Sequence, residues 1–166
     1  MTSWCLLGLG TPLRRDDGVG IRILKEIQKS AHEAIKGVDC IDGGTGGFSL
    51  LHLISQYEVV IVLDAVYYGG KPGQVHLFSE DEIKSVKEPC WSSTHGLDFL
   101  DVLRMAREID TKPKTVYVIG IQPYTVSTGN SLSPVIEQQL THILNTVLSM
   151  LQQIRTDHKN NQEGNS

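Results

Sequence analysis

Several features typical of common functional classes are missing from this chain of 166 residues. The three cysteines, Cys5, Cys40 and Cys90, are odd in number and widely spaced, which excludes a disulfide framework and a paired-cysteine metal site. They indicate reduced thiols in a cytosolic protein. The net charge of −4 leaves no basic excess for a nucleic-acid backbone, and no apolar run approaches the ~18 residues of a membrane span. The start, MTSWCLLGLG, has no basic leader, so we expect a cytoplasmic protein that binds neither nucleic acid nor membrane.

What the chain does contain is an alternation of short apolar runs with helical patterns. The runs typical of strands cover residues 4–8, 38–41, 59–63, 74–78 and 115–121, and the fourth of them alternates as an edge strand does. The patterns typical of helices cover residues 18–31, 48–56, 96–109 and 133–154. This order predicts an α/β fold, a three-layer αβα sandwich with a mostly parallel twisted sheet of about five strands and helices on both faces. We expect one domain over residues 1–154 and a polar, disordered tail over residues 155–166.

The segment GLGTPLRRDDGVG, residues 8–20, follows the first predicted strand. It begins like a nucleotide-binding turn, but it lacks the third glycine of a dinucleotide fingerprint and the Gly-Lys-Ser/Thr of a P-loop. Asp16 and Asp17 place negative charge where the next helix begins, which repels a phosphate and suits a cation. In the alternative interpretation these aspartates only cap the helix, although one of them can do so and leave the other for a ligand.

A further carboxylate, Asp64, ends the third predicted strand in VLDAV. Ligands of open parallel sheets bind beyond the carboxyl ends of the strands, where the strand order reverses. If the first three strands lie in the order 2-1-3, Asp17 and Asp64 face one crevice; otherwise Asp64 is an ordinary turn residue. His95, in STHGL, is the best-placed histidine, although its position also suits an ordinary residue of a helix first turn. Two carboxylates and an imidazole suit a borderline divalent ion such as zinc or nickel.

The segment DGGTGG, residues 42–47, directly follows the second predicted strand. Glycines at this density indicate positive φ angles or a close backbone approach. The segment is either a flexible turn or a rim of the same crevice that accepts an extended peptide. In the second interpretation Asp42, Gly43 and Gly44 are the substrate-binding residues.

Together, several segments resemble the maturation endopeptidases of nickel-iron hydrogenases, in the family's order and over residues 5–148. These segments are GLGTPLRRDDGVG, CIDGGTGG, VLDAV, STHGL, VIGIQP and SLSPVIE. The resemblance implies a protease that cuts a short C-terminal extension from the hydrogenase large-subunit precursor after nickel insertion. The family's metal positions fall on Asp17, Asp64 and His95, and a motif linked to substrate recognition falls on the glycine-rich turn with Asp42. Thr11 stands where the family usually has Asn, and Asp17 stands where it often has Glu.

The resemblance also implies that nickel arrives with the substrate and is sensed by the three metal-site residues, which zinc or cadmium can occupy instead. The general base is left between Asp16 and Asp42. The family is grouped with aspartic-type peptidases, but this chain lacks the Asp-Thr/Ser-Gly pair of pepsin-like enzymes. Two other functions stay open: a metal-dependent hydrolase of a small substrate with its own tightly bound metal, and a nickel-dependent chaperone that binds the precursor without cutting it.

Overall fold

The protein is described by a computed structural model that covers residues 2–85 and 99–164. Five strands form one sheet: β1 (Trp4–Gly8), β2 (Val38–Asp42), β3 (Val59–Ala65), β4 (Val75–Phe78) and β5 (Thr115–Ile121). Their order is β2-β1-β3-β5-β4, and only β4, at one edge, runs antiparallel to its neighbour. The mostly parallel five-stranded sheet, the edge position of the fourth strand and the 2-1-3 order of the first three are therefore confirmed.

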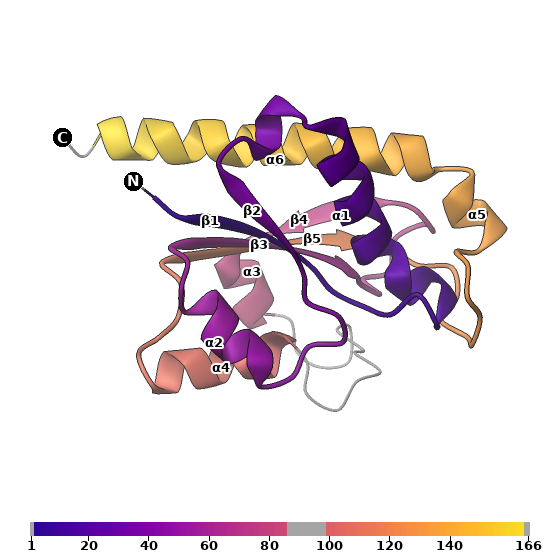
Figure 1. The fold of residues 1–166 in the computed structure, drawn as a ribbon, viewed down its shortest axis with the longest axis horizontal. Helices are drawn as coiled ribbons and strands as arrows, with labels where there is room; N and C mark the ends of the chain where they lie inside the picture. The colour runs from indigo at the N-terminus through magenta and orange to yellow at the C-terminus, as the bar shows by residue number, and fades with distance from the viewer. Residues whose placement is uncertain (1, 86–98, 165–166) are drawn as a thin grey trace.

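The helices form a layer on each face of the sheet. The α-helices are α1 (Val19–Ser30), α2 (Ser49–Ile54), α3 (Glu80–Ser85), α4 (Phe99–Glu108), α5 (Pro134–Glu137) and α6 (Leu140–Glu163), and the 3₁₀ helices are η1 (Arg15–Gly18) and η2 (Glu33–Ile35). Figure 1 shows α1 and α6 over one face and α2, α3 and α4 over the other, which is the predicted three-layer sandwich. Within the described ranges, none of the helices combines the length and apolar character needed to cross a membrane.

Burial on both faces explains why the central strands read as continuous apolar runs. In β1, Leu6 packs into the core beneath α1 and α6, whereas Cys5 and Leu7 pack into the core beneath α2 and α4. In β3, Ile61 and Val62 divide in the same way. Successive side chains of a strand point to opposite faces, so a strand covered by helices on both sides needs apolar residues throughout.

The C-terminal helix differs from the prediction in two ways. It is broken, because α5 ends at Glu137 and α6 begins at Leu140, whereas the pattern predicts one helix from about residue 133 to residue 154. The side chain of Gln139 sits at the break and donates to the backbone carbonyls of Val135 and Pro72. The expected disorder after residue 154 is also wrong for residues 155–163, which continue α6.

Tertiary contacts and helix propagation account for this extension. Polar composition suggests disorder because it offers little apolar area to bury, but adding a residue to an existing helix is much easier than nucleating a new one. Arg155 donates to the backbone carbonyl of Ala34 at 2.9 Å. The ring of His158 meets the edge of the Trp4 ring, with 4.9 Å between centroids.

Candidate active site

The carboxyl ends of β1 and β3 lie side by side, and this places two of the predicted site residues at one edge of the sheet. Gly8 is in register with Leu63, and the Leu9 N–H donates to the Leu63 carbonyl at 2.9 Å. Asp64 follows directly in β3, and η1, which carries Asp17, packs against that strand. The chain passes from β1 to β2, on one side of β1, and then returns to β3, on the other side of β1. Because the strand order reverses here, the carboxyl ends of β1 and β3 form the switch point of the sheet.

Asp17 is held by the turn that precedes it. The residue is 9% exposed, and its Oδ2 accepts from the backbone N–H of Thr11 at 3.0 Å. Gly10 has a φ of +118°, and a Cβ on it would overlap the Asp17 carbonyl oxygen, so only glycine fits there. Because the donor is the backbone of Thr11, the replacement of the family's usual Asn by Thr leaves this bond in place.

Asp16 has a different environment from its neighbour. It is completely buried, and its Oδ1 accepts from the backbone N–H of Ser133 at 2.7 Å. Its Oδ2 accepts from the N–H groups of Tyr124 and Thr125, both at 3.0 Å, and from the Ser133 hydroxyl at 2.8 Å. Neither aspartate caps α1, whose N-cap is Gly18 with no side-chain bond, so the capping interpretation is wrong. Four hydrogen bonds make Asp16 an anchor between η1 and the loop that follows β5.

The glycine-rich turn, residues 42–47, is hydrogen-bonded to the segment of residues 8–20 that follows β1, which we call the first turn. Gly43 donates its N–H to the Gly8 carbonyl at 2.8 Å, and the Gly44 carbonyl accepts from the N–H of Gly10 at 2.7 Å. Gly44 has a φ of +56°, and a Cβ on Gly43 would lie within 3 Å of two leucine side chains. These observations confirm the positive φ and the close approach. Asp42, which is exposed, accepts from the Gly44 N–H at 2.9 Å and lies at the same edge as the ends of β1 and β3.

Tyr67, which the sequence analysis did not consider, carries a hydroxyl whose pKa is affected by both aspartates. It follows the end of β3 by two residues, and burial raises the pKa of its hydroxyl. The negative charges of Asp16 and Asp17 raise that pKa further, while Arg14 lowers it, so the phenol lies within electrostatic reach of both carboxylates and stays protonated. Its position three residues after Asp64, at the end of a buried strand, is the signal that could have pointed to it.

The third predicted ligand, His95, lies outside the described residues. Among residues 2–85 and 99–164, no three histidine, cysteine, aspartate or glutamate side chains gather as a metal site. Of the three predicted metal ligands, the described part of the chain therefore places two, Asp17 and Asp64, at the sheet edge. Asp64 and Asp17 both make further interactions within the protein.

The fold and this edge define the class: an α/β protein with a mostly parallel sheet that carries Asp17 and Asp64 at its switch point. The family follows from comparison with known proteins, since a model described as hydrogenase maturation protease (HycI) matches residues 21–150. The hydrogenase expression/formation protein HupD of Thiocapsa roseopersicina is 33% identical over 150 residues, which cover 89% of this chain and 67% of HupD. The chain belongs to the hydrogenase maturation protease family, and its activity is that of an endopeptidase.

Two further relatives agree with this assignment over nearly their full length. The hydrogenase 2 maturation protease of Escherichia coli is 27% identical over 149 residues, covering 89% of this chain and 90% of the relative. The solved structure of the hydrogenase maturating endopeptidase HybD from E. coli superposes with a TM-score of 0.74 at 25% identity, covering 91% of this chain and 93% of HybD. The sheet with its two helical layers is thus the fold of these endopeptidases.

Proposed function

We propose that this endopeptidase removes the C-terminal extension of the nickel-iron hydrogenase large-subunit precursor, and that it acts only once nickel has been inserted. The observation that carries the proposal is the strand order, which brings the turn after β1 and the end of β3 to one sheet edge. In the proposal, Asp17, Asp64 and His95 bind the nickel that the substrate carries. Two carboxylates and an imidazole form a donor set suited to a borderline divalent ion, so zinc or cadmium can occupy the site in vitro.

The first turn and the glycine-rich turn have separate tasks in this proposal. The Thr11 N–H orients the Asp17 carboxylate, so that Asp17 is set before the substrate arrives. The backbone around Gly43 and Gly44, which is fastened to the first turn, binds the extended peptide next to the cut. Bound nickel supplies Lewis-acid polarisation of the scissile carbonyl or of a water.

We assign the general-base role to Asp42 rather than Asp16. The Asp16 carboxylate is fully buried and already accepts four hydrogen bonds, so a substrate water has no access to it. Asp42 is exposed at the same sheet edge, and within residues 2–85 and 99–164 its carboxylate accepts one hydrogen bond, from the Gly44 N–H to Oδ1. As a base, Asp42 accepts a proton of the attacking water while the water oxygen bonds to the peptide carbonyl carbon and the C=O π electrons move to the carbonyl oxygen. When this tetrahedral intermediate collapses, the C–N bond breaks and the protonated Asp42 returns its proton to the leaving nitrogen. The enzyme is then of the aspartic type.

A cleavage assay tests the proposal. Incubation with nickel-loaded precursor yields a shortened product by mass spectrometry, whereas nickel-free precursor stays intact. Asp17→Asn, Asp64→Asn and His95→Ala abolish cleavage, while His142→Ala, an exposed histidine of α6, does not. Equal cleavage of the two precursor forms contradicts nickel sensing, and binding without any cleavage favours the chaperone.

The role of Asp42 has its own readout. If Asp42 is the base, Asp42→Asn lowers kcat with little change in KM, because an amide accepts no proton at neutral pH. If it only binds the peptide, KM rises instead.

Reagents directed at serine or cysteine nucleophiles leave an aspartic-type enzyme active. Cys5 and Cys40 are free thiols, which agrees with a reaction in the cytoplasm.

A further inference from the structure

A small basic pocket lies beside the first turn, between that turn, α1 and the loop that follows β5. Its volume is about 170 Å³. The side chains that line it include three cations, Arg15, Arg22 and Lys25, and no acidic residue. Apolar atoms of Ile21 and Leu132 complete its walls. This concentration of positive charge contrasts with the net charge of −4 of the whole chain.

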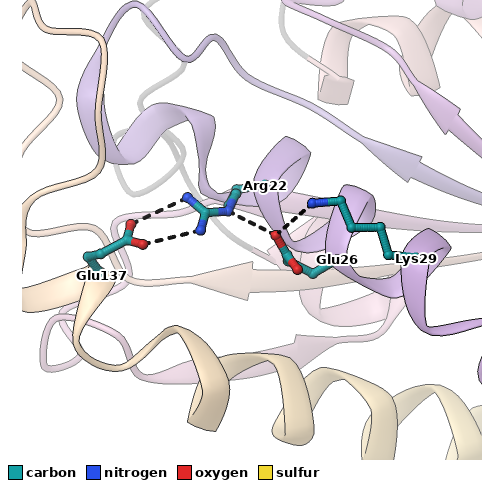
Figure 2. Close-up of polar contacts among 4 residues, drawn as sticks. All are labelled: Arg22, Glu26, Lys29 and Glu137. Atoms are coloured by element: carbon teal, nitrogen blue, oxygen red, sulfur yellow. Dashed lines mark hydrogen bonds and ion pairs between the residues drawn. The ribbon is translucent and has the colours of Figure 1, made fainter.

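Two of the three cations have no partner in the described part of the protein. Figure 2 shows Arg22 bonded to Glu137 of α5 and to Glu26 one turn further along α1, with N···O distances of 3.2 Å to each. The guanidinium of Arg15 and the ammonium of Lys25 make no ion pair or side-chain hydrogen bond with any residue of ranges 2–85 and 99–164. Arg15 and Lys25 therefore give the pocket positive charge that no described side chain neutralises, whereas the charge of Arg22 is already neutralised by its two glutamates.

The backbone holds Arg15 in place. Its φ is +47°, in the left-handed region that residues with a side chain rarely adopt. Its N–H donates to the Gly129 carbonyl at 3.2 Å, and its side chain lies over Gly129, where a Cβ would come within 2.9 Å of its Cγ. The next residue, Asp16, anchors the other wall through Ser133. A positive φ at a residue with a side chain is a strained backbone conformation, and it persists where the surrounding structure holds the residue in place. A guanidinium that is already held in place loses less entropy when it binds a ligand.

We infer that this pocket binds an acidic side chain of the protein substrate. The inference rests on the proposed function, which supplies a protein as substrate. The pocket is smaller than the roughly 300–1,000 Å³ typical of sites for small molecules, and its volume suits one side chain. A guanidinium and an ammonium together favour a carboxylate. Pro12 and Gly18 of the first turn line the pocket, so an acidic side chain of the substrate that binds there lies beside the turn that carries Asp17.

Charge variants test the pocket. Lys25→Glu raises KM for the nickel-loaded precursor by about fivefold, since a weak attraction becomes a weak repulsion, and it leaves kcat unchanged. Arg15→Gln, which keeps the aliphatic stem over Gly129, raises KM by about threefold. Lys36→Glu is the matched control, because Lys36 is exposed outside the pocket and carries the same charge. Added salt reduces the difference between wild type and Lys25→Glu.

A charge-swap experiment identifies the partner. Each acidic residue of the precursor is changed to lysine in turn and tested against Lys25→Glu. One such precursor variant restores a near-normal KM with Lys25→Glu while it impairs cleavage by the wild type. A purely structural role for Lys25 gives no such rescue.

Direct binding separates this inference from the proposed function. The Kd of the immobilised precursor is measured for wild type, Lys25→Glu and Lys36→Glu. If wild type binds but never cuts, the proposed function fails, and weaker binding by Lys25→Glu alone still supports the pocket. If wild type cuts, while Lys25→Glu and Arg15→Gln change neither KM nor Kd, the pocket has no role in docking and the proposed function stands.

Discussion

Replacing Asp16 by asparagine removes a charged acceptor without changing its shape. The amide oxygen can take the place of Oδ2 and keep the bonds from Tyr124, Thr125 and the Ser133 hydroxyl, but its NH₂ group then faces the Ser133 N–H. Three bonds to a charged acceptor become neutral bonds, at a loss of about 1 kcal/mol each, and one buried N–H loses its partner at about 1–3 kcal/mol. The sum, about 5 kcal/mol, is an upper value, because a neutral amide escapes the desolvation cost of a buried carboxylate.

We therefore expect Asp16→Asn to lower the free energy of unfolding by about 3 kcal/mol and the Tm by about 6–12 °C. Urea unfolding followed by circular dichroism measures the change. Asp110→Asn is the control: Asp110 is exposed, its φ of +55° suits asparagine, and the expected change stays within about 0.5 kcal/mol. A loss below about 1 kcal/mol would refute the anchoring role. Abolished cleavage in an equally stable Asp16→Asn variant would instead restore Asp16 as the general base.

Three further predictions follow from single contacts. Gly10→Ala destabilises the protein by at least about 3 kcal/mol in urea unfolding because the new Cβ meets the backbone of Asp17, whereas Gly37→Ala, where φ is +73° and the space is open, costs about 1 kcal/mol. Burial raises the pKa of Cys5 to about 12, so we expect iodoacetamide at pH 8 to leave Cys5 unmodified in the native protein and to label it in urea, as measured by peptide mass spectrometry. The thiol of the unfolded protein ionises at a lower pH than the thiol of the folded protein, so Cys5 lowers the free energy of unfolding as the pH rises above about 8.5. Deletion of residues 155–166 removes the Arg155 bond to Ala34 and lowers the free energy of unfolding by roughly 2 kcal/mol, whereas an unchanged Tm would mean that this end of α6 adds no stability.

Most of the sheet could be predicted because its strands carry a strong local signal. The run 59–63 is apolar throughout and 115–121 is mostly so, as is typical of strands covered on both faces. Alternation with helical patterns then implies parallel strands joined by crossovers. The break at Gln139 could not be predicted, because it depends on a contact with Pro72, 67 residues away in the chain. The helical end of α6 was missed because composition carries no information on helix propagation.

The candidate site was predictable where topology alone decides the outcome. Asp17 lies in the segment that follows β1 and Asp64 lies at the end of β3, and parallel strands send their carboxyl ends to one edge. The anchoring role of Asp16 depends instead on partners distant in the chain. The donors to Asp16 lie 108 to 117 residues further on, and no pattern within the first turn indicates them.

The different fates of Asp16 and Asp17 show how one short turn serves two purposes. Adjacent residues of a 3₁₀ helix point about a third of a turn apart, so the two carboxylates meet different partners: Asp16 accepts from the loop after β5, and Asp17 accepts from the backbone of Thr11. Asp16 fixes η1 to the loop after β5, and that loop forms a wall of the basic pocket. The residue before Asp16 is in the pocket and the residue after it is in the proposed metal site. In the proposed function, docking of the substrate and recognition of its nickel both depend on this single anchored turn, so we expect that loosening Asp16 impairs the two together.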